Sequence, residues 1–194
     1  MLTAAENSLP SLSALTHQNL QARIRAVILM SLSNNNKQLL ITTGNKSEYA
    51  TGYATIYGDM CGAFNPIKDI YKTEIYKIAR FRNNNIPLSI NIKTNVSSAL
   101  PESLFTKAPT AELSFNQKDS DSLPEYDLLD KVLNLHIEQK LSHNAIVKLG
   151  FDNIVVRKII GLVKNSEFKR RQAAPGVKIS SCNFEKERRY PITT

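Results

Sequence analysis

Thr43 and Glu48 follow the short apolar run QLLIT and are the first residues that could take part in chemistry. In an open α/β sheet, ligands bind outside the carboxyl ends of the strands, where the next helix presents free backbone N–H groups. The backbone of Thr43 could meet an adenine or a ribose there, and Glu48, one turn later, could reach a metal ion held between phosphates. In the alternative interpretation, which spacing alone favours, Thr43 and Gly44 form a simple turn and Glu48 complements the helix dipole.

A set of basic residues could bind an anion. Arginine makes forked contacts with phosphate or carboxylate, while lysine acts as a mobile point charge. Arg23 and Arg25 are two positions apart, so a helix would point them to different sides and they cannot both face one ligand. Most surface basic residues only contact solvent, and this interpretation is favoured for each residue taken alone. The set comprises Arg23, Arg25, Lys72, Lys107, Lys169, Arg170 and Arg171.

Other reactive side chains give weaker indications. Thr110 follows Pro109, which holds the preceding chain extended, so its hydroxyl could bind a phosphate or cap a turn. Ser47 lies in no Gly-x-Ser-x-Gly motif, so a hydrolase triad is not supported. Cys61 and Cys182 are too few and too far apart for a disulfide framework or a zinc site. The three histidines have no nucleophile or metal partner at a meaningful spacing.

The elements that must position these residues alternate between helix and strand. Residues 19–32 carry apolar side chains at helical spacing, which predicts an amphipathic helix that starts near Thr16 or His17. QLLIT predicts a buried strand, and residues 45–58 predict a helix that ends at Gly58. This order indicates an α/β layer with a parallel sheet.

The second half of the chain is predicted to be mainly helical. Residues 72–83 predict an amphipathic helix, whereas residues 84–123, with three prolines, predict mostly loop and one short helix near 95–100. Pro124 and the acids after it are typical of a helix start. Further helices are predicted over 143–149, closed by Gly150, and from 153 to about 169, followed by an ordered tail or short strands from 173.

Composition and charge limit the classes of function. The 194 residues are 42% hydrophobic, as in an ordinary globular protein. No apolar run is long enough to span a bilayer and no signal peptide is recognisable, so we expect a cytoplasmic protein. The net charge is +8, and residues 157–194 carry 10 Lys and Arg against 3 Asp and Glu. Such a basic tail suits nucleic acid, a membrane surface or a phosphate-rich small molecule; without interleaved aromatics, nucleic acid is the weaker choice.

Six ordered blocks of sequence carry a family resemblance: NLQARIR, LLITTGNKSEYATGYATIYGDMCGAFNPIKDIYKTEIYKIARFRN, TKAPTAEL, QKDSDSLPEYDLLD, EFKRRQAAPGVK and RRYPIT. They resemble the C-terminal synthetase domain of bacterial glutamine-dependent NAD synthetases. The resemblance covers residues 16–194 and makes residues 1–15 a leader or linker remnant. It implies the adenine-nucleotide α-hydrolase-like, or ATP pyrophosphatase, fold: a Rossmann-like parallel sheet with helices on both faces, incomplete at its N-terminus, plus a helical C-terminal part.

The resemblance also implies a ligase reaction. Members of the family use ATP and Mg²⁺ to adenylate the nicotinate carboxylate of deamido-NAD, release pyrophosphate, and let ammonia derived from glutamine displace AMP to give NAD. A carboxylate has no usable leaving group until AMP supplies one, while the metal and a lysine neutralise charge that develops on the phosphates.

The family's site residues map onto positions of this chain. Thr43, Lys72 and Thr110 are similar to residues that contact ATP, and Lys72 is the one that reaches the phosphates. Glu48 is similar to a glutamate that contacts magnesium or the dinucleotide, so Lys72 and Glu48 are the catalytic pair that the resemblance implies.

A second group is implied to bind deamido-NAD. It comprises Glu48, Asn19 and Arg23 in a dimer-forming helix, and Lys169 in a segment that closes over the substrate. We expect the basic C-terminal segment to be mobile until substrate binds, or else to be a solvated basic surface.

Two features of the family are absent from this sequence. The pyrophosphate-binding loop, Ser-Gly-Gly-x-Asp-Ser, needs adjacent glycines, and no two of the 7 glycines are adjacent here. The glutaminase domain, with its catalytic cysteine, is missing as well. We therefore expect a C-terminal portion of a longer enzyme, a homo-oligomer, that depends on the missing parts. The alternative is a catalytically inactive fragment that binds nucleotide or dimerises.

Overall fold

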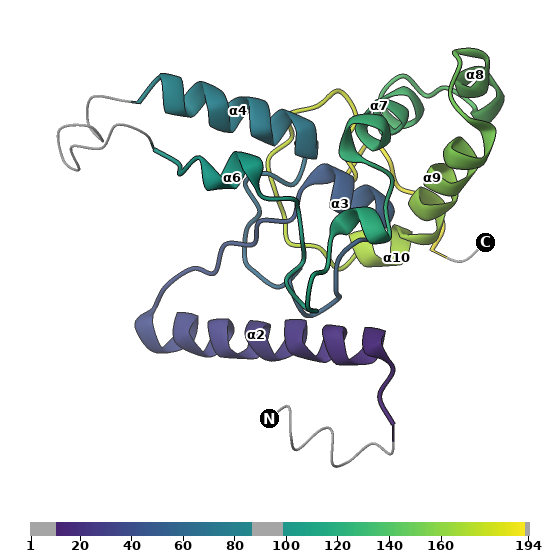
Figure 1. Ribbon diagram of the computed structural model, residues 1–194. Coiled ribbons are helices and arrows are strands. Elements are labelled where there is room, and N and C mark those ends of the chain that lie inside the picture. Colours follow the sequence, from purple (N-terminus) through teal and green to yellow (C-terminus); the bar gives the residue numbers. More distant parts are fainter. Residues whose placement is uncertain (1–10, 87–98, 193–194) are drawn as a thin grey trace.

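The computed structural model describes residues 11–86 and 99–192 (Figure 1). This part of the chain is mainly helical, and none of its helices is long and apolar enough to cross a membrane. The elements in chain order are α2 (Ala14–Asn36), α3 (Lys46–Thr51), α4 (Lys72–Asn84), α6 (Ser103–Thr106), the 3₁₀ helix η1 (Asp119–Asp121), α7 (Tyr126–Ile137), α8 (His143–Lys148), α9 (Asn153–Asn165) and α10 (Glu167–Arg170).

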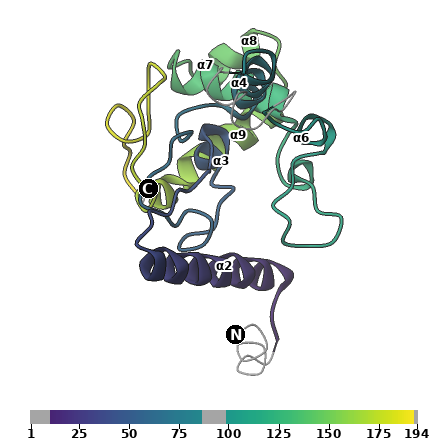
Figure 2. The same cartoon turned by 90° about the vertical axis from the view of Figure 1, so that its left-hand side faces the viewer.

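Helix α2 lies along one side of the molecule, apart from the other helices, in both views (Figures 1 and 2). It begins a little before the predicted start, because the side chain of Ser13 accepts a hydrogen bond from the N–H of Thr16 and caps it. Only Ala22 and Ala26 of α2 are buried, so most of the surface of this helix is exposed.

The hydrophobic core is formed by the apolar faces of α7 and α9, with α3 and α8 packed against them. As predicted, α7 begins just after Pro124, and α8 is followed by Gly150, whose positive φ of 95° turns the chain away. The core side chains with no exposed surface include Leu129, Val132, Leu133, Ile137, Ile146, Val156 and Ile159.

The predicted buried strand is wrong. Leu39 is 66% exposed and Ile41 is 43% exposed, and the run makes only one isolated parallel bridge, between Ile41 and Phe64. A second parallel bridge joins Asn65 to Gly176. A strand is buried only when neighbours cover both of its edges and faces, and the described residues supply a single bridge to this run.

Two predicted helices end earlier than expected. Helix α3 stops at Thr51 because Gly52 adopts a left-handed φ of 71° and its N–H donates to the carbonyl of Glu48. The predicted helix 153–169 is interrupted at Ser166, which separates α9 from α10. The short helix predicted near 95–100 falls mostly outside the described residues, and α6 starts after it.

Lys46, the first residue of α3, is a fully buried cation with 0% exposed surface. Its Nζ lies 3.0 Å from Asp69 Oδ1 and 2.7 Å from Glu138 Oε1. The same nitrogen donates hydrogen bonds to Ser180 Oγ at 2.5 Å and to the carbonyl of Cys182 at 2.9 Å. The ammonium is therefore paired and hydrogen-bonded, which is what allows a charge to remain buried.

The basic C-terminal segment is anchored rather than free. Lys68 Nζ donates to the carbonyl of Ala174 at 2.6 Å, and Asp69 accepts a hydrogen bond from the N–H of Ser180 at 2.7 Å. Together with the bonds of Lys46, these contacts hold residues 173–192 against the rest of the molecule. This packing is the arrangement expected of a closed segment, and its mobility before substrate binds stays a prediction.

Candidate functional site

Glu48 and Lys72 meet where the N-termini of α3 and α4 come together. Asn45 and Glu48 form a capping box at the start of α3: Asn45 Oδ1 accepts from the N–H of Glu48, and Glu48 Oε2 accepts from the N–H of Asn45, each at 3.0 Å. This fixes one carboxylate oxygen of Glu48. The other, Oε1, lies 3.6 Å from Lys72 Nζ.

The pair is largely screened from solvent, with the side chains of Glu48 and Lys72 20% and 21% exposed. Burial raises the pKa of Glu48, although the ammonium of Lys72 and the hydrogen bond from Asn45 act in the opposite direction. The aromatic rings of Tyr126 and Tyr76 lie 5.6 Å and 6.0 Å from Lys72 Nζ. A ligand that carries both a metal ion and an anionic group fits such a pair. The carboxylate can bind the metal ion, and the ammonium can bind the anionic group.

Asp119 lies beside this pair and was missed by sequence analysis. Its Oδ2 accepts a hydrogen bond from the hydroxyl of Tyr126 at 2.8 Å, while its Oδ1 is buried with no hydrogen-bond partner. The Asp119 charge contributes to the raised pKa values of Glu48 and Tyr126, for which burial is the largest cause. Its only signal in the sequence is the acidic run 119–121, which lies in the segment predicted to be mostly loop.

Asn19, Arg23 and Lys169 form a second group around the loop 52–59. Thr55 Oγ1 donates to Asn19 Oδ1 at 2.8 Å, and Arg23 Nε donates to the carbonyl of Ile56 at 3.2 Å. Helix α2 and α10 thus approach this loop from different directions.

Lys169 fixes the beginning of the same loop. Its Nζ donates to the carbonyls of Gly52 and Ala54, at 2.7 Å and 2.8 Å. Burial lowers the pKa of Lys169, and the nearby Arg23 adds to the effect. A cleft of about 180 Å³ opens here, lined by Asn19, Thr55, Lys169 and neighbouring residues. The structure therefore brings together three of the four residues expected to bind deamido-NAD, whereas the fourth, Glu48, pairs with Lys72.

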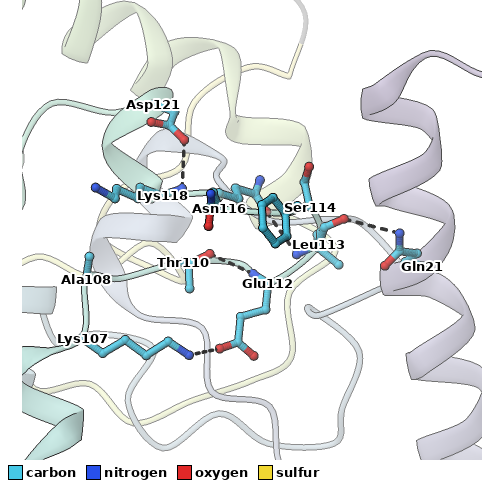
Figure 3. A pocket seen from close by; sticks show the side chains of 12 residues that line it. Gln21, Lys107, Ala108, Thr110, Glu112, Leu113, Ser114, Asn116, Lys118 and Asp121 are labelled. Carbon is cyan, nitrogen blue, oxygen red and sulfur yellow. Dashed lines mark hydrogen bonds and ion pairs between the residues drawn. The ribbon is translucent and has the colours of Figure 1, made fainter.

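Thr43 is exposed at the edge of an adjoining cleft of about 270 Å³, which shares Asp59, Ala111 and Leu113 with the first cleft. Thr110 lies elsewhere, in an open pocket between α2 and residues 107–121 (Figure 3). Its Oγ1 accepts a hydrogen bond from the N–H of Glu112 at 3.1 Å, as in a capped turn. Thr110 is thus not among the residues that line the two clefts.

Three other basic candidates have structural partners. Arg25 donates to the carbonyl of Glu112 at 3.0 Å, and Lys107 pairs with the carboxylate of the same residue. Arg170 is buried, pairs with Glu167 at 2.9 Å and donates to the carbonyl of Ala50 at 3.0 Å. Within the described ranges, no three or more His, Cys, Asp and Glu side chains gather in a way that could hold a metal ion.

The NAD synthase family model matches residues 2–173, and the chain belongs to this family. It is 49% identical over 179 residues to a glutamine-dependent NAD(+) synthetase of Xanthomonas campestris pv. campestris, covering 92% of this chain and 31% of the relative. It is 48% identical over 179 residues to the enzyme of that name from Thermotoga maritima, covering 92% of this chain and 30% of the relative. The chain thus spans about a third of the length of these relatives, and the family expectation is confirmed.

Solved structures show the same relationship. The crystal structure of a glutamine-dependent NAD(+) synthetase from Cytophaga hutchinsonii matches 99% of this chain and 31% of its own, with a TM-score of 0.74 and 26% identity. An NH3-dependent NAD synthetase from Campylobacter jejuni matches 87% of this chain and 56% of its own, with a TM-score of 0.58 and 28% identity. The chain has the fold of this part of the NAD synthetases.

Proposed function

We propose that this chain is the synthetase part of a glutamine-dependent NAD synthetase, which converts deamido-NAD to NAD with ATP in the cytoplasm. The observation that carries the proposal is the Lys72–Glu48 pair, in which the two side chains implied to be catalytic lie 3.6 Å apart at adjacent helix N-termini. Their identity was expected from sequence, but their proximity was not.

Each residue group has a role in this reaction. Lys72 neutralises charge that develops on the phosphates of ATP during adenylation. Glu48 would hold Mg²⁺, which supplies Lewis-acid stabilisation of the phosphates when bound. Thr43 contacts ATP from the edge of its cleft. Thr110 also contacts ATP, from the segment 107–121 that reaches the pair at Asp119.

The group around the loop 52–59 binds deamido-NAD. Asn19 and Arg23 hold the loop from α2, and Lys169 holds it from α10. Binding there would place the nicotinate carboxylate near the phosphates of ATP, and ammonia then displaces AMP. Proximity of this kind removes much of the entropic cost of a reaction between two substrates.

The remaining parts of the family enzyme are proposed to complete the site. The two isolated bridges are both parallel, as in the ATP pyrophosphatase sheet, and the exposed Leu39 and Ile41 mark where further strands would pack. We propose that the rest of a protein as long as the relatives supplies these strands, the phosphate-binding loop and the glutaminase domain that provides ammonia.

A homo-oligomer through α2 is part of the proposal. Val27, Ile28, Leu29 and Leu32 of α2 are each about half exposed, although all are large and apolar. Large apolar side chains that remain this exposed on one helix are typical of an interface. Size-exclusion chromatography with light scattering should show an assembly that Ile28→Glu dissociates, and a monomeric wild-type protein would contradict this.

The function is tested by assaying the complete protein with deamido-NAD, ATP, Mg²⁺ and either ammonium or glutamine. We expect NAD and pyrophosphate in equal amounts, and no pyrophosphate without deamido-NAD. Binding of ATP and deamido-NAD without either product would instead support the alternative of an inactive nucleotide-binding fragment.

A further inference from the structure

Helix α4, which begins with Lys72, has no cap from its own preceding residue. The first N–H groups of a helix have no partner within the helix and need one from elsewhere. Tyr71, at the cap position, makes no side-chain capping bond. Instead, the N–H of Lys72 donates to Ser47 Oγ at 3.0 Å, and the N–H of Thr73 donates to Asp130 Oδ2 at 2.9 Å. The start of α4 is therefore capped by α3 and α7.

Asp130 is the centre of this arrangement. The residue is 5% exposed, and both of its carboxylate oxygens are engaged. Oδ1 accepts from Ser47 Oγ at 2.5 Å, and Oδ2 accepts from the hydroxyl of Thr73 at 2.8 Å in addition to its N–H. The carboxylate accepts all three bonds. Asp130 therefore links its own helix, α7, to α3 through Ser47 and to α4 through Thr73.

The bonded residues are the immediate neighbours of the proposed catalytic pair. Ser47 precedes Glu48 in α3, and Thr73 follows Lys72 in α4. The carboxylate of Asp130 also lies at the N-terminus of α4, where a negative charge stabilises the helix. We infer that Asp130 is a positioning residue, which sets the relative placement of Lys72 and Glu48 without contacting substrate. This inference rests on the proposed function.

Two opposing effects act on the pKa of Asp130. Burial raises its pKa, whereas the hydrogen bonds from Ser47 and Thr73 lower it. An asparagine at this position would keep one acceptor oxygen and turn an NH₂ group toward a donor. The backbone N–H or the hydroxyl of Thr73, or the hydroxyl of Ser47, would then lose its partner.

The test uses Asp130→Asn in the complete protein, with Glu138→Gln as the matched control. Both changes convert a carboxylate of the α7 region to an amide, but Glu138 bonds Lys46 and Ser181 instead of the start of α4. We expect Asp130→Asn to slow pyrophosphate release about 10-fold and to raise the KM for ATP, because small displacements of reacting groups are costly. The KM for deamido-NAD should stay near the wild-type value. Equal kinetics for the two variants would overturn the inference.

A double variant separates positioning from general destabilisation. If Asp130 acts through Lys72, the variant Asp130→Asn with Lys72→Ala should be no slower than Lys72→Ala alone. Multiplied losses would show that Asp130 acts independently of Lys72. Ser47→Ala is the milder change, should Asp130→Asn fail to fold. It removes the acceptor of the Lys72 N–H and should act in the same direction.

Hydrogen exchange gives a readout that does not depend on activity. The amides of Lys72 and Thr73 should exchange faster in Asp130→Asn than in wild type, and at the wild-type rate in Glu138→Gln. Unchanged exchange in Asp130→Asn would exclude the capping role. A wild-type protein that forms no NAD, but shows the expected exchange, would refute the proposed function and leave the capping geometry standing.

Discussion

Lys72 Nζ lies 3.6 Å from Glu48 Oε1, although the two residues belong to different helices. The pair brings a cation and an anion to one place before any ligand is present. Lys72 can then pair with the phosphates of a metal–nucleotide complex, and Glu48 can pair with its metal ion. Without that complex, the two side chains compensate each other for the hydration they lose on burial.

Removing either charge should impair adenylation. In the complete protein, Lys72→Ala and Glu48→Ala should each reduce pyrophosphate release more than 10-fold, since loss of one electrostatic contact at a reacting centre costs about 3 kcal/mol. The control is Lys178→Ala, whose ion pair with Glu187 is at the surface. Wild-type rates in both site variants would remove these residues from the site.

Lys169 should matter more for the dinucleotide than for ATP. Its ammonium holds the carbonyls of Gly52 and Ala54 at the start of the loop that Asn19 also contacts through Thr55. We expect Lys169→Ala to raise the KM for deamido-NAD more than the KM for ATP, measured by steady-state kinetics. Lys164→Ala, an exposed change in the last turn of α9, serves as the control. Equal increases in both KM values would contradict the assignment.

The two glycines Gly52 and Gly161 should respond to alanine in opposite ways. Gly52 has a φ of 71°, and a Cβ there would collide with the side chain of Ser166, so Gly52→Ala should lower the free energy of unfolding by about 1–3 kcal/mol. Gly161 lies inside α9 with open space around it, so Gly161→Ala should raise that free energy by up to about 1 kcal/mol. Urea unfolding measures both.

Acid should weaken the anchoring of the C-terminal segment. Burial tends to raise the pKa of Asp69, but hydrogen bonds from the N–H groups of Ile179 and Ser180 and the charge of Lys46 lower it below its ordinary value of 3.8. A carboxylate with a lowered pKa stabilises the fold above its unfolded pKa, and this contribution is lost as pH falls through the folded pKa.

The measurement is the free energy of unfolding at pH 6 and at pH 3. Wild type should lose stability between these values, and Asp69→Asn should lose less, because the variant lacks the titrating group. An equal loss in the variant would show that other carboxyl groups carry the acid sensitivity.

Sequence predicted the helices whose periodicity and end signals agree, such as α7 after Pro124 and α8 before Gly150. It failed at the run QLLIT, because an apolar run does not reveal whether neighbouring strands exist to cover it. It also predicted that α3 continues past Gly52, where the left-handed backbone ends the helix and the carbonyl accepts a bond from Lys169, 117 positions away.

The candidate site was predictable only in part. The roles of Glu48 and Lys72 came from family resemblance, since spacing favoured a simpler explanation for Glu48. Asp119 and Asp130 were missed because their roles depend on residues far away in the chain: the charge of Asp119 acts on Glu48, and Asp130 bonds Thr73, 57 positions away. Such pairings leave no local pattern for sequence analysis to detect.

The buried ammonium of Lys46 also affects how the chain can fold during synthesis. Two of its partners, Ser180 and Cys182, follow it by 134 and 136 positions. A ribosome needs on the order of ten seconds to add that many residues, and an ammonium buried without its partners would be strongly destabilising. The start of α3 therefore cannot reach its final environment until Ser180 and Cys182 have left the ribosome, and the region around the proposed site completes its folding after that point.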